Sequence, residues 1–186
     1  MKRLVIITVG KTHSGKTTFA KALELQLNDS LVIDQDNHAE FINSFYKSIV
    51  PKQGPNTLKY AITQTIVDYA VNEANNHLIL CNANRNQKGR LDLLEHFHNK
   101  GFVSIIVNFD IPDQVLRERV EKSQRSTSIF RSASSFMEVL ARQQSEYDNW
   151  DVIAPKEGEA DHLFLIKDNE EIKTVIQRIV SIARNS

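Results

Sequence analysis

The chain alternates short apolar runs with longer segments of helical periodicity. The apolar runs lie at residues 3–9, 30–34, 77–81, 102–109 and 162–166. Each is bounded by turn-forming residues, which is typical of short strands buried on both faces of a sheet. Between them, apolar residues recur every three or four positions over residues 16–28, 37–49, 56–75, 88–99, 112–122, 132–149 and 169–184. This alternation predicts an α/β fold in which helices cover both faces of a parallel sheet.

Two segments interrupt the pattern without dividing the chain. Residues 49–56 contain two prolines and a glycine, which separate one helix from the next but are too few for a domain linker. Residues 121–135 are polar and rich in serine, so we expect a short lid there and not part of the core. The length of 186 residues predicts a single domain over residues 1–186.

The overall charge argues against two classes of partner. Lysine plus arginine and aspartate plus glutamate number 23 each, so no global basic field favours nucleic acid or a membrane surface. The only cysteine, Cys81, has no partner for an internal disulfide, and the apolar start of the chain is too short for a signal-peptide core. No run approaches the roughly 20 apolar residues of a membrane span. We therefore expect a cytoplasmic protein.

A phosphate-binding motif follows the first apolar run. Its pattern, G-x-x-x-x-G-K-[ST], lies between a predicted strand and a predicted helix, at Gly10, Gly15, Lys16 and Thr17. The glycines permit a tight turn whose N–H groups converge on phosphate oxygens at the positive end of the helix. We expect Lys16 to reach the β- and γ-phosphates of ATP, Thr17 to bind Mg²⁺ and Thr18 to contact the α-phosphate. The predicted nucleotide-binding residues are Gly10, Thr12, His13, Ser14, Gly15, Lys16, Thr17 and Thr18.

Two aspartates at the end of the second apolar run are candidates for catalysis. Asp34 and Asp36 stand where the ligands of open α/β sheets bind. Residues two apart on an extended chain point the same way, so both carboxylates are expected to face the γ-phosphate. We predict that Asp36 is the base for an acceptor hydroxyl and that Asp34 holds Mg²⁺ or orients the strand exit. An alternative role for Asp36 is the N-cap of the following helix.

These motifs occur in an order that resembles a group of P-loop kinases. Residues 32–38, VIDQDNH, resemble the DGDN segment of adenylyl-sulfate kinases, and more of the chain resembles the AAA-type ATP-binding group of bacteriophage polynucleotide kinase, seryl-tRNA kinases and zeta-type toxins. The positions of that group's Asp-x-Thr-Asn motif and of the arginine that follows it are occupied here by Cys81, Asn82, Ala83, Asn84 and Arg90. Its glycine, Asp-x-Pro and leucine–arginine helix are matched by Gly101, Asp110, Pro112, Leu116 and Arg119. The resemblance implies a three-layer P-loop NTPase fold of nucleoside-kinase type, with five parallel strands in the order 2-3-1-4-5.

The chain departs from this group at three positions. Cys81 replaces the usual Walker B aspartate, so Asp34 would have to supply the carboxylate near Mg²⁺. Ala39 stands where several relatives carry a substrate-binding arginine, and Ala83 replaces the threonine of Thr-Asn. These departures leave the acceptor open and leave room for an altered catalyst.

Arginines are expected to stabilise the transferring phosphoryl group. Arg119 precedes the predicted lid and Arg125 lies in it, and both join Lys16 and Asp36 as predicted catalytic residues. Arginine suits this role because its planar fork contacts two phosphate oxygens at once, although both arginines also fit a solvated helix face. The predicted acceptor-binding residues are Asp36, Asn84, Arg90 and Arg131. For Asn84, a turn is an equally good interpretation.

The sequence thus predicts an ATP-dependent phosphotransferase that moves the γ-phosphoryl group to a hydroxyl of a small-molecule or nucleoside-like acceptor. A GTPase is disfavoured because Asn99-Lys100 lacks the aspartate of the guanine-binding motif. Two alternatives remain. One is an ATP-binding regulatory or toxin-like protein with weak kinase activity, and the other is a kinase acting on nucleic-acid ends, against which the balanced charge weighs. Trp150 is expected near the adenine or at the end of the helix that follows the lid.

Overall fold

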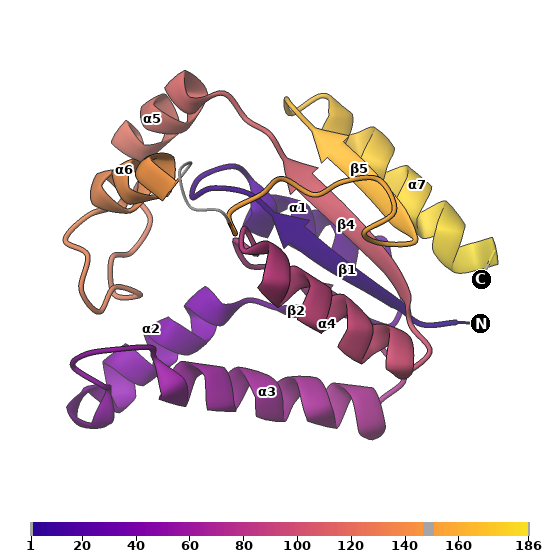
Figure 1. The fold of residues 1–186 in the computed structure, drawn as a ribbon, viewed down its shortest axis with the longest axis horizontal. Helices are drawn as coiled ribbons and strands as arrows, with labels where there is room; N and C mark the ends of the chain where they lie inside the picture. Colours follow the sequence, from indigo (N-terminus) through magenta and orange to yellow (C-terminus); the bar gives the residue numbers. More distant parts are fainter. Residues whose placement is uncertain (1, 147–150, 186) are drawn as a thin grey trace.

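Five parallel strands form the sheet at the centre of the computed structural model, which describes residues 2–146 and 151–185 (Figure 1). They are β1 (Leu4–Val9), β2 (Ser30–Ile33), β3 (His77–Leu80), β4 (Val103–Phe109) and β5 (His162–Ile166). Their spatial order is β2-β3-β1-β4-β5. In β1, Ile6 pairs with Ile79 of β3 on one side and with Ile105 of β4 on the other. The parallel sheet and its predicted order are therefore confirmed.

Helices connect the strands. They are α1 (Lys16–Glu24), α2 (Gln35–Phe45), the short 3-10 helix η1 (Lys47–Ile49), α3 (Thr57–Asn72), α4 (Gln87–Asn99), α5 (Asp113–Glu121), α6 (Phe136–Ser145) and α7 (Glu171–Asn185). Each predicted helical segment is present, with ends that differ by a few residues. Helix α6 begins four residues later than predicted because the Ser135 side chain caps it, accepting a hydrogen bond from the N–H of Glu138. Its predicted end near residue 149 and the predicted place of Trp150 lie outside the described residues.

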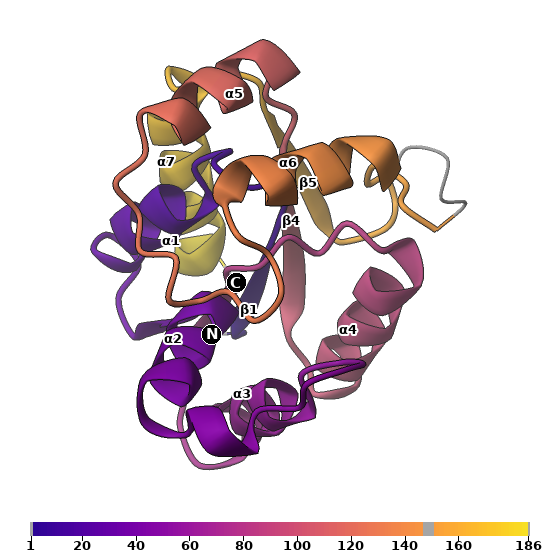
Figure 2. The same ribbon diagram turned by 90° about the vertical axis from the view of Figure 1, so that its left-hand side faces the viewer.

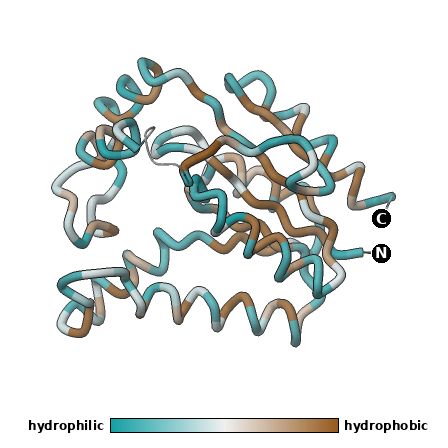
Figure 3. The backbone as a smooth tube through the Cα atoms, viewed as in Figure 1, coloured by the Kyte–Doolittle hydropathy of each residue, from teal (hydrophilic) through white to brown (hydrophobic). Residues whose placement is uncertain are grey.

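Strand β1 is buried along its whole length and separates two apolar clusters. Leu4 and Ile6 pack with residues of α1 and α7, whereas Val5 and Ile7 pack with residues of α3 and α4. This division follows from the alternation of side chains along a strand. Figure 3 shows the apolar residues concentrated along the strands. Helices therefore cover both faces, which gives the three layers that the continuous apolar runs predict.

The loops that follow β1, β2 and β3 gather at the carboxyl edge of the sheet. There, α5 and α6 lie on one side and α2 and α3 on the other (Figures 1 and 2). The N–H of Gly10 donates to the carbonyl of Ala83 at 3.0 Å, which links the loop after β1 to the loop after β3. Residues 122–135, between α5 and α6, contain neither helix nor strand. Within the described parts of the chain, none of the helices has the length and apolar character needed to cross a membrane.

Arg90 ties the start of α4 to the segment before β5. Its side chain is fully buried, and its guanidinium donates to both carboxylate oxygens of Glu159, at 3.2 and 3.1 Å. The same group donates to the carbonyl oxygens of Asn84, Arg85 and Ile153. Because the Glu159 side chain is only 8% exposed, this ion pair is shielded from water on both sides. Its loss would leave a buried charge without a counter-ion.

We therefore expect Glu159→Ala to lower the free energy of unfolding by about 3 kcal/mol, since breaking a buried pair leaves one charge uncompensated. Urea denaturation measures the change. The control is Asp92→Ala, which breaks the exposed Lys88–Asp92 pair on α4 and should cost less than about 1 kcal/mol. Equal effects of the two substitutions would contradict the structural role given to Arg90.

Candidate active site

The loop from Gly10 to Gly15 connects β1 to α1 and depends on its two glycines. A Cβ atom at Gly10 would lie 2.9 Å from the Ser14 hydroxyl and 3.0 Å from the Phe109 carbonyl oxygen, so no larger residue fits there. Gly15 has a φ of 101°, a left-handed conformation that glycine adopts without strain, and it forms the N-cap of α1. In the part of the chain that the structure describes, no side chain caps α1, and the first turn of this helix holds no acidic residue. Its first N–H groups are therefore available to an anion.

Lys16 is half-buried beneath this loop among neutral acceptors. Its ammonium donates to the carbonyl oxygen of Lys11 at 2.5 Å and to the Ser14 hydroxyl at 3.2 Å. Burial lowers the pKa of Lys16 to about 8, and the negative charges of Asp36 and Asp34 oppose only part of this shift. Among the described residues, no carboxylate lies at ion-pair distance from this ammonium, and a phosphate oxygen would provide the missing counter-charge.

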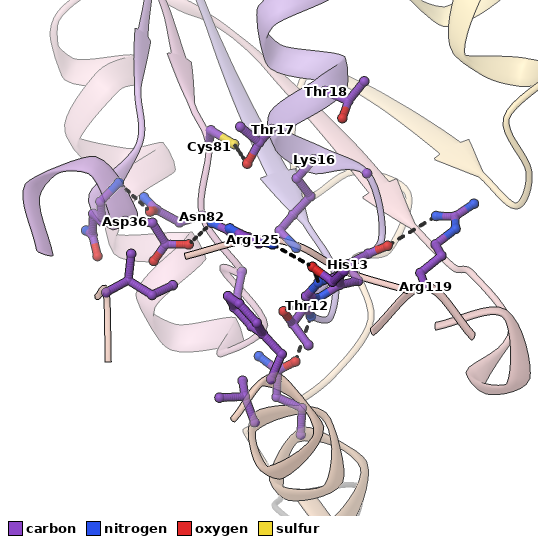
Figure 4. A pocket seen from close by; sticks show the side chains of 18 of the residues that line it. Thr12, His13, Lys16, Thr17, Thr18, Asp36, Cys81, Asn82, Arg119 and Arg125 are labelled. Atoms are coloured by element: carbon purple, nitrogen blue, oxygen red, sulfur yellow. Dashed lines mark hydrogen bonds and ion pairs between the residues drawn. The ribbon is translucent and has the colours of Figure 1, made fainter. Parts of the chain in front are cut away.

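Thr17, Asp34 and Cys81 meet where α1 approaches the ends of β2 and β3. The Thr17 hydroxyl donates to Asp34 Oδ2 at 3.1 Å. The Cys81 thiol lies 3.6 Å from the same hydroxyl (Figure 4). Burial raises the pKa of Cys81 to about 11, with a further contribution from the negative charge of Asp34. Cys81 is therefore a neutral thiol at physiological pH, and Asp34 is the carboxylate beside Thr17.

The expectation that Asp34 and Asp36 share one extended segment was wrong, because α2 already begins at Gln35. Asp34 is the N-cap of that helix: its Oδ1 accepts a hydrogen bond from the N–H of Asp36 at 2.9 Å. Its other oxygen remains directed to Thr17. Asp36 lies in the first turn of the helix, and its carboxylate forms an ion pair with Arg125 at 2.6 Å.

Residues 122–135 reach from the phosphate-binding loop to α2 and beyond. His13 Nε2 is 2.8 Å from the Ser123 hydroxyl, and Asn43 of α2 donates to the carbonyl of Ser128 at 2.6 Å. Arg131 donates to the carbonyl oxygens of Pro51 and Gly54. With the Asp36–Arg125 pair, these contacts attach the segment to both sides of the site.

A cavity of about 830 Å³ lies between these elements, a size suited to a ligand with its cofactor (Figure 4). Of the residues predicted to bind nucleotide or to act in catalysis, the cavity is lined by Thr12, His13, Gly15, Lys16, Thr17, Thr18, Asp36, Arg119 and Arg125. Arg119 donates to the His13 carbonyl at 3.2 Å and to Asn169 Oδ1 at 3.1 Å. Burial and the charges of Arg125, Lys16 and Arg119 lower the pKa of His13 to about 4, so its ring is neutral at pH 7.

Three predicted acceptor-binding residues do not line the cavity. The Asn84 amide donates to the carbonyl of Thr8 at 2.9 Å in a left-handed turn, with a φ of 43°. Arg90 is buried against Glu159, and Arg131 is bonded to main-chain carbonyls. Gly10 and Ser14 lie beneath the lining residues, and Ser14 is 2% exposed.

Sequence reasoning missed several residues that do line the cavity. Gln143 of α6 accepts a hydrogen bond from the N–H of Thr12 at 2.7 Å. Lys59 of α3 and Arg142 of α6 add positive charge to the wall, and Asn82 orients α2 by accepting from the N–H of Gln35. Gln143, Lys59 and Arg142 belong to no local motif, because tertiary packing alone brings α3 and α6 to this edge of the sheet. Asn82 lies in the segment after β3 whose positions match the kinase group, and that match is the signal that could have identified it.

The comparisons with known proteins agree with this geometry. A family model described as an AAA domain matches residues 5–149, and the search of curated proteins found no match. Among solved structures, the chain is similar to the APS kinase CysC of Mycobacterium tuberculosis in complex with AMPPNP and APS, with 16% identity and a TM-score of 0.60 over 98% of each chain. It is also similar to Kti12 of Chaetomium thermophilum in complex with ADP-AlF3, with 19% identity and a TM-score of 0.61 over 94% of this chain and 96% of that one.

A third similar structure is the shikimate kinase of Bacteroides thetaiotaomicron, with 15% identity and a TM-score of 0.56 over 97% of this chain and 98% of that one. At these identities, the three structures establish a shared fold. The predicted P-loop kinase-like fold is therefore confirmed.

The neutral state of Cys81 is directly testable because the chain has no other cysteine. With a pKa of about 11, only about one thiol in a thousand is ionised at pH 8, so we expect iodoacetamide to alkylate the native protein very slowly. Mass spectrometry measures the adduct. The same protein unfolded in urea is the control and should react fast. A native protein that reacts as fast as the unfolded one would show that Cys81 is an accessible thiolate.

Proposed function

Because the chain belongs to the AAA domain family and has a P-loop kinase-like fold, we propose that it is an ATP-dependent phosphotransferase with an alcohol as acceptor. The observation that carries the proposal is the meeting, in one cavity, of a carboxylate–guanidinium pair and a half-buried ammonium that forms no ion pair with any of the described residues. The ammonium, that of Lys16, suits the phosphates of a nucleotide. The pair, Asp36 with Arg125, suits the activation of a hydroxyl and the stabilisation of a transferring phosphoryl group.

On the nucleotide side, the loop N–H groups and Lys16 would hold the β- and γ-phosphates. The Thr17 hydroxyl and the Asp34 carboxylate fit Mg²⁺, which prefers oxygen ligands and takes its remaining ones from phosphates and water. The described residues contain no group of three or more acidic, histidine or cysteine side chains that would bind a metal without the nucleotide. When bound, Mg²⁺ would neutralise charge on the phosphate oxygens.

On the acceptor side, Asp36 would take the proton of the incoming hydroxyl. The acceptor oxygen would then bond to the γ-phosphorus, the bond from that phosphorus to the β,γ-bridging oxygen would break, and ADP would leave. Asp36 must first separate from Arg125. The released guanidinium would turn toward the γ-phosphate oxygens, whose charge it can contact with two N–H groups. Arg119, already bonded to the loop at His13, would support the same charge.

One observation favours a second candidate, an ATP-binding regulator with little turnover. Cys81 stands where related kinases have a carboxylate, and its raised pKa keeps it uncharged. Asp34 would then be the only carboxylate beside Thr17, and it also caps α2. Such a site supports nucleotide binding better than it supports rapid transfer.

Asp36→Asn separates the two candidates. We expect wild-type protein with labelled ATP to phosphorylate at least one alcohol in a broad metabolite panel, and Asp36→Asn to lower that rate by about 10²–10⁴-fold, the usual contribution of a general base. Affinity for the analogue AMPPNP should change by less than about fivefold, because an exposed ion pair contributes little. Asp68→Asn, an exposed substitution on α3, is the control and should leave both measurements unchanged.

Full activity of Asp36→Asn would contradict the role of Asp36 as the base. A wild-type protein that binds AMPPNP but transfers phosphate to no alcohol in the panel would favour the regulator.

A further inference from the structure

Lys59 is a cation of the cavity wall whose role the transfer reaction leaves unexplained. It lies in the first turn of α3, is half-buried and lines the cavity. Within residues 2–146 and 151–185, no carboxylate lies at ion-pair distance from its ammonium, and no hydrogen bond satisfies it. Its ammonium lies 5.1 Å from the centroid of the neighbouring Tyr60 ring. The charge therefore faces the cavity without a partner.

A charged ammonium at Lys59 is energetically unfavourable because the side chain is half-buried. Burial lowers the pKa of Lys59, and the nearby positive charge of Arg131 lowers it further, although Asp36 and Asp34 oppose the shift. A half-buried ammonium is stabilised when an anion replaces the water that it has lost. An incoming anionic group would provide that stabilisation.

The other charges of the cavity do not balance Lys59. The charged residues of the wall are Lys16, Lys59, Arg119, Arg125, Arg142 and Asp36. The only carboxylate among them, Asp36, is already paired with Arg125. Lys16 and Arg119 are bonded to the phosphate-binding loop, and Arg142 is exposed on α6. Lys59 therefore leaves an unmatched positive charge on the wall that α3 forms.

The position of Lys59 points to the acceptor and not to the nucleotide. Helix α3, which carries Lys59, packs against α2, whose first turn holds Asp36: His38 Nδ1 of α2 lies 2.8 Å from the Thr63 hydroxyl of α3. Lys59 and Asp36 thus both line the part of the cavity wall that α2 and α3 form, across from α5 and α6 (Figure 1).

Resting on the kinase function proposed above, we propose that the acceptor alcohol carries an oxyanion of its own, a phosphate or a carboxylate, and that Lys59 binds it. The hydroxyl would lie at Asp36 and the oxyanion on the α3 side of the cavity. An ammonium suits either oxyanion, because it acts as a compact charge without a fixed fork geometry. Uncharged alcohols would leave Lys59 unpaired and would bind more weakly.

The test uses protein saturated with AMPPNP and Mg²⁺, so that the phosphate-binding loop is filled. Inorganic phosphate and, separately, acetate are titrated into wild type, Lys59→Gln, Lys59→Arg and Lys52→Gln, with binding followed by NMR shifts. We expect at least one of the two anions to bind wild type and Lys59→Gln to bind it about tenfold or more weakly, the usual effect of losing a charge-assisted hydrogen bond. Lys59→Arg retains the charge and should retain most of the affinity. Lys52 is exposed and does not line the cavity, so Lys52→Gln should match wild type.

A parallel assay with labelled ATP compares alcohols in pairs that differ only by a phosphate or carboxylate group. We expect wild type to prefer the anionic member of a pair and Lys59→Gln to lose that preference through a raised KM. Equal anion binding by Lys59→Gln and wild type, or no anion binding by wild type that binds AMPPNP, would overturn the inference while the nucleotide-binding function stands. A weaker affinity of Lys59→Gln for AMPPNP would overturn it as well, since Lys59 would then serve the nucleotide. Failure of wild type to bind AMPPNP would overturn the proposed function and, with it, this inference.

Discussion

The half-buried ammonium of Lys16 is the feature around which the site is built. Its partners, the carbonyl of Lys11 and the hydroxyl of Ser14, are neutral, and burial lowers its pKa to about 8. The loop that provides these acceptors follows β1, which is buried on both faces, and its first residue, Gly10, packs closely against Phe109.

The parallel sheet explains how distant segments of the chain meet at this charge. Because β1, β2 and β3 are parallel neighbours, the residues that follow them lie at one edge. Asp34 after β2 and Cys81 after β3 both reach Thr17 in α1. The cap that Asp34 provides to α2 also sets the position of Asp36 in the first turn of that helix. One carboxylate thus contributes to the helix start and to the site at the same time.

Local patterns in the sequence predict much of the fold and only part of the site. The strands and the phosphate-binding loop are encoded by contiguous residues, so apolar runs and glycine spacing are sufficient to find them. The start of α2 is not found in this way. The pattern predicts that Asp34 and Asp36 share one extended segment, whereas Asp34 caps the helix and the helix begins at Gln35. Lys59 and Gln143 reach the cavity only through the packing of α3 and α6. Their sequence context is that of ordinary helix residues, so no local signal identifies them.

The central claim is that Lys16 is a desolvated cation that contacts the phosphates of a nucleotide. Calorimetric titration with AMPPNP and Mg²⁺ from about pH 7 to about pH 10 tests it most directly. The bound phosphates would raise the pKa of Lys16 above its value of about 8 in the free protein, so binding at higher pH requires uptake of a proton. Wild-type affinity should therefore fall above pH 8 by up to about tenfold per pH unit, whereas Lys16→Arg, which keeps its proton, should show no such fall. The same pH dependence in both proteins, or no binding of AMPPNP to wild type, would contradict the account.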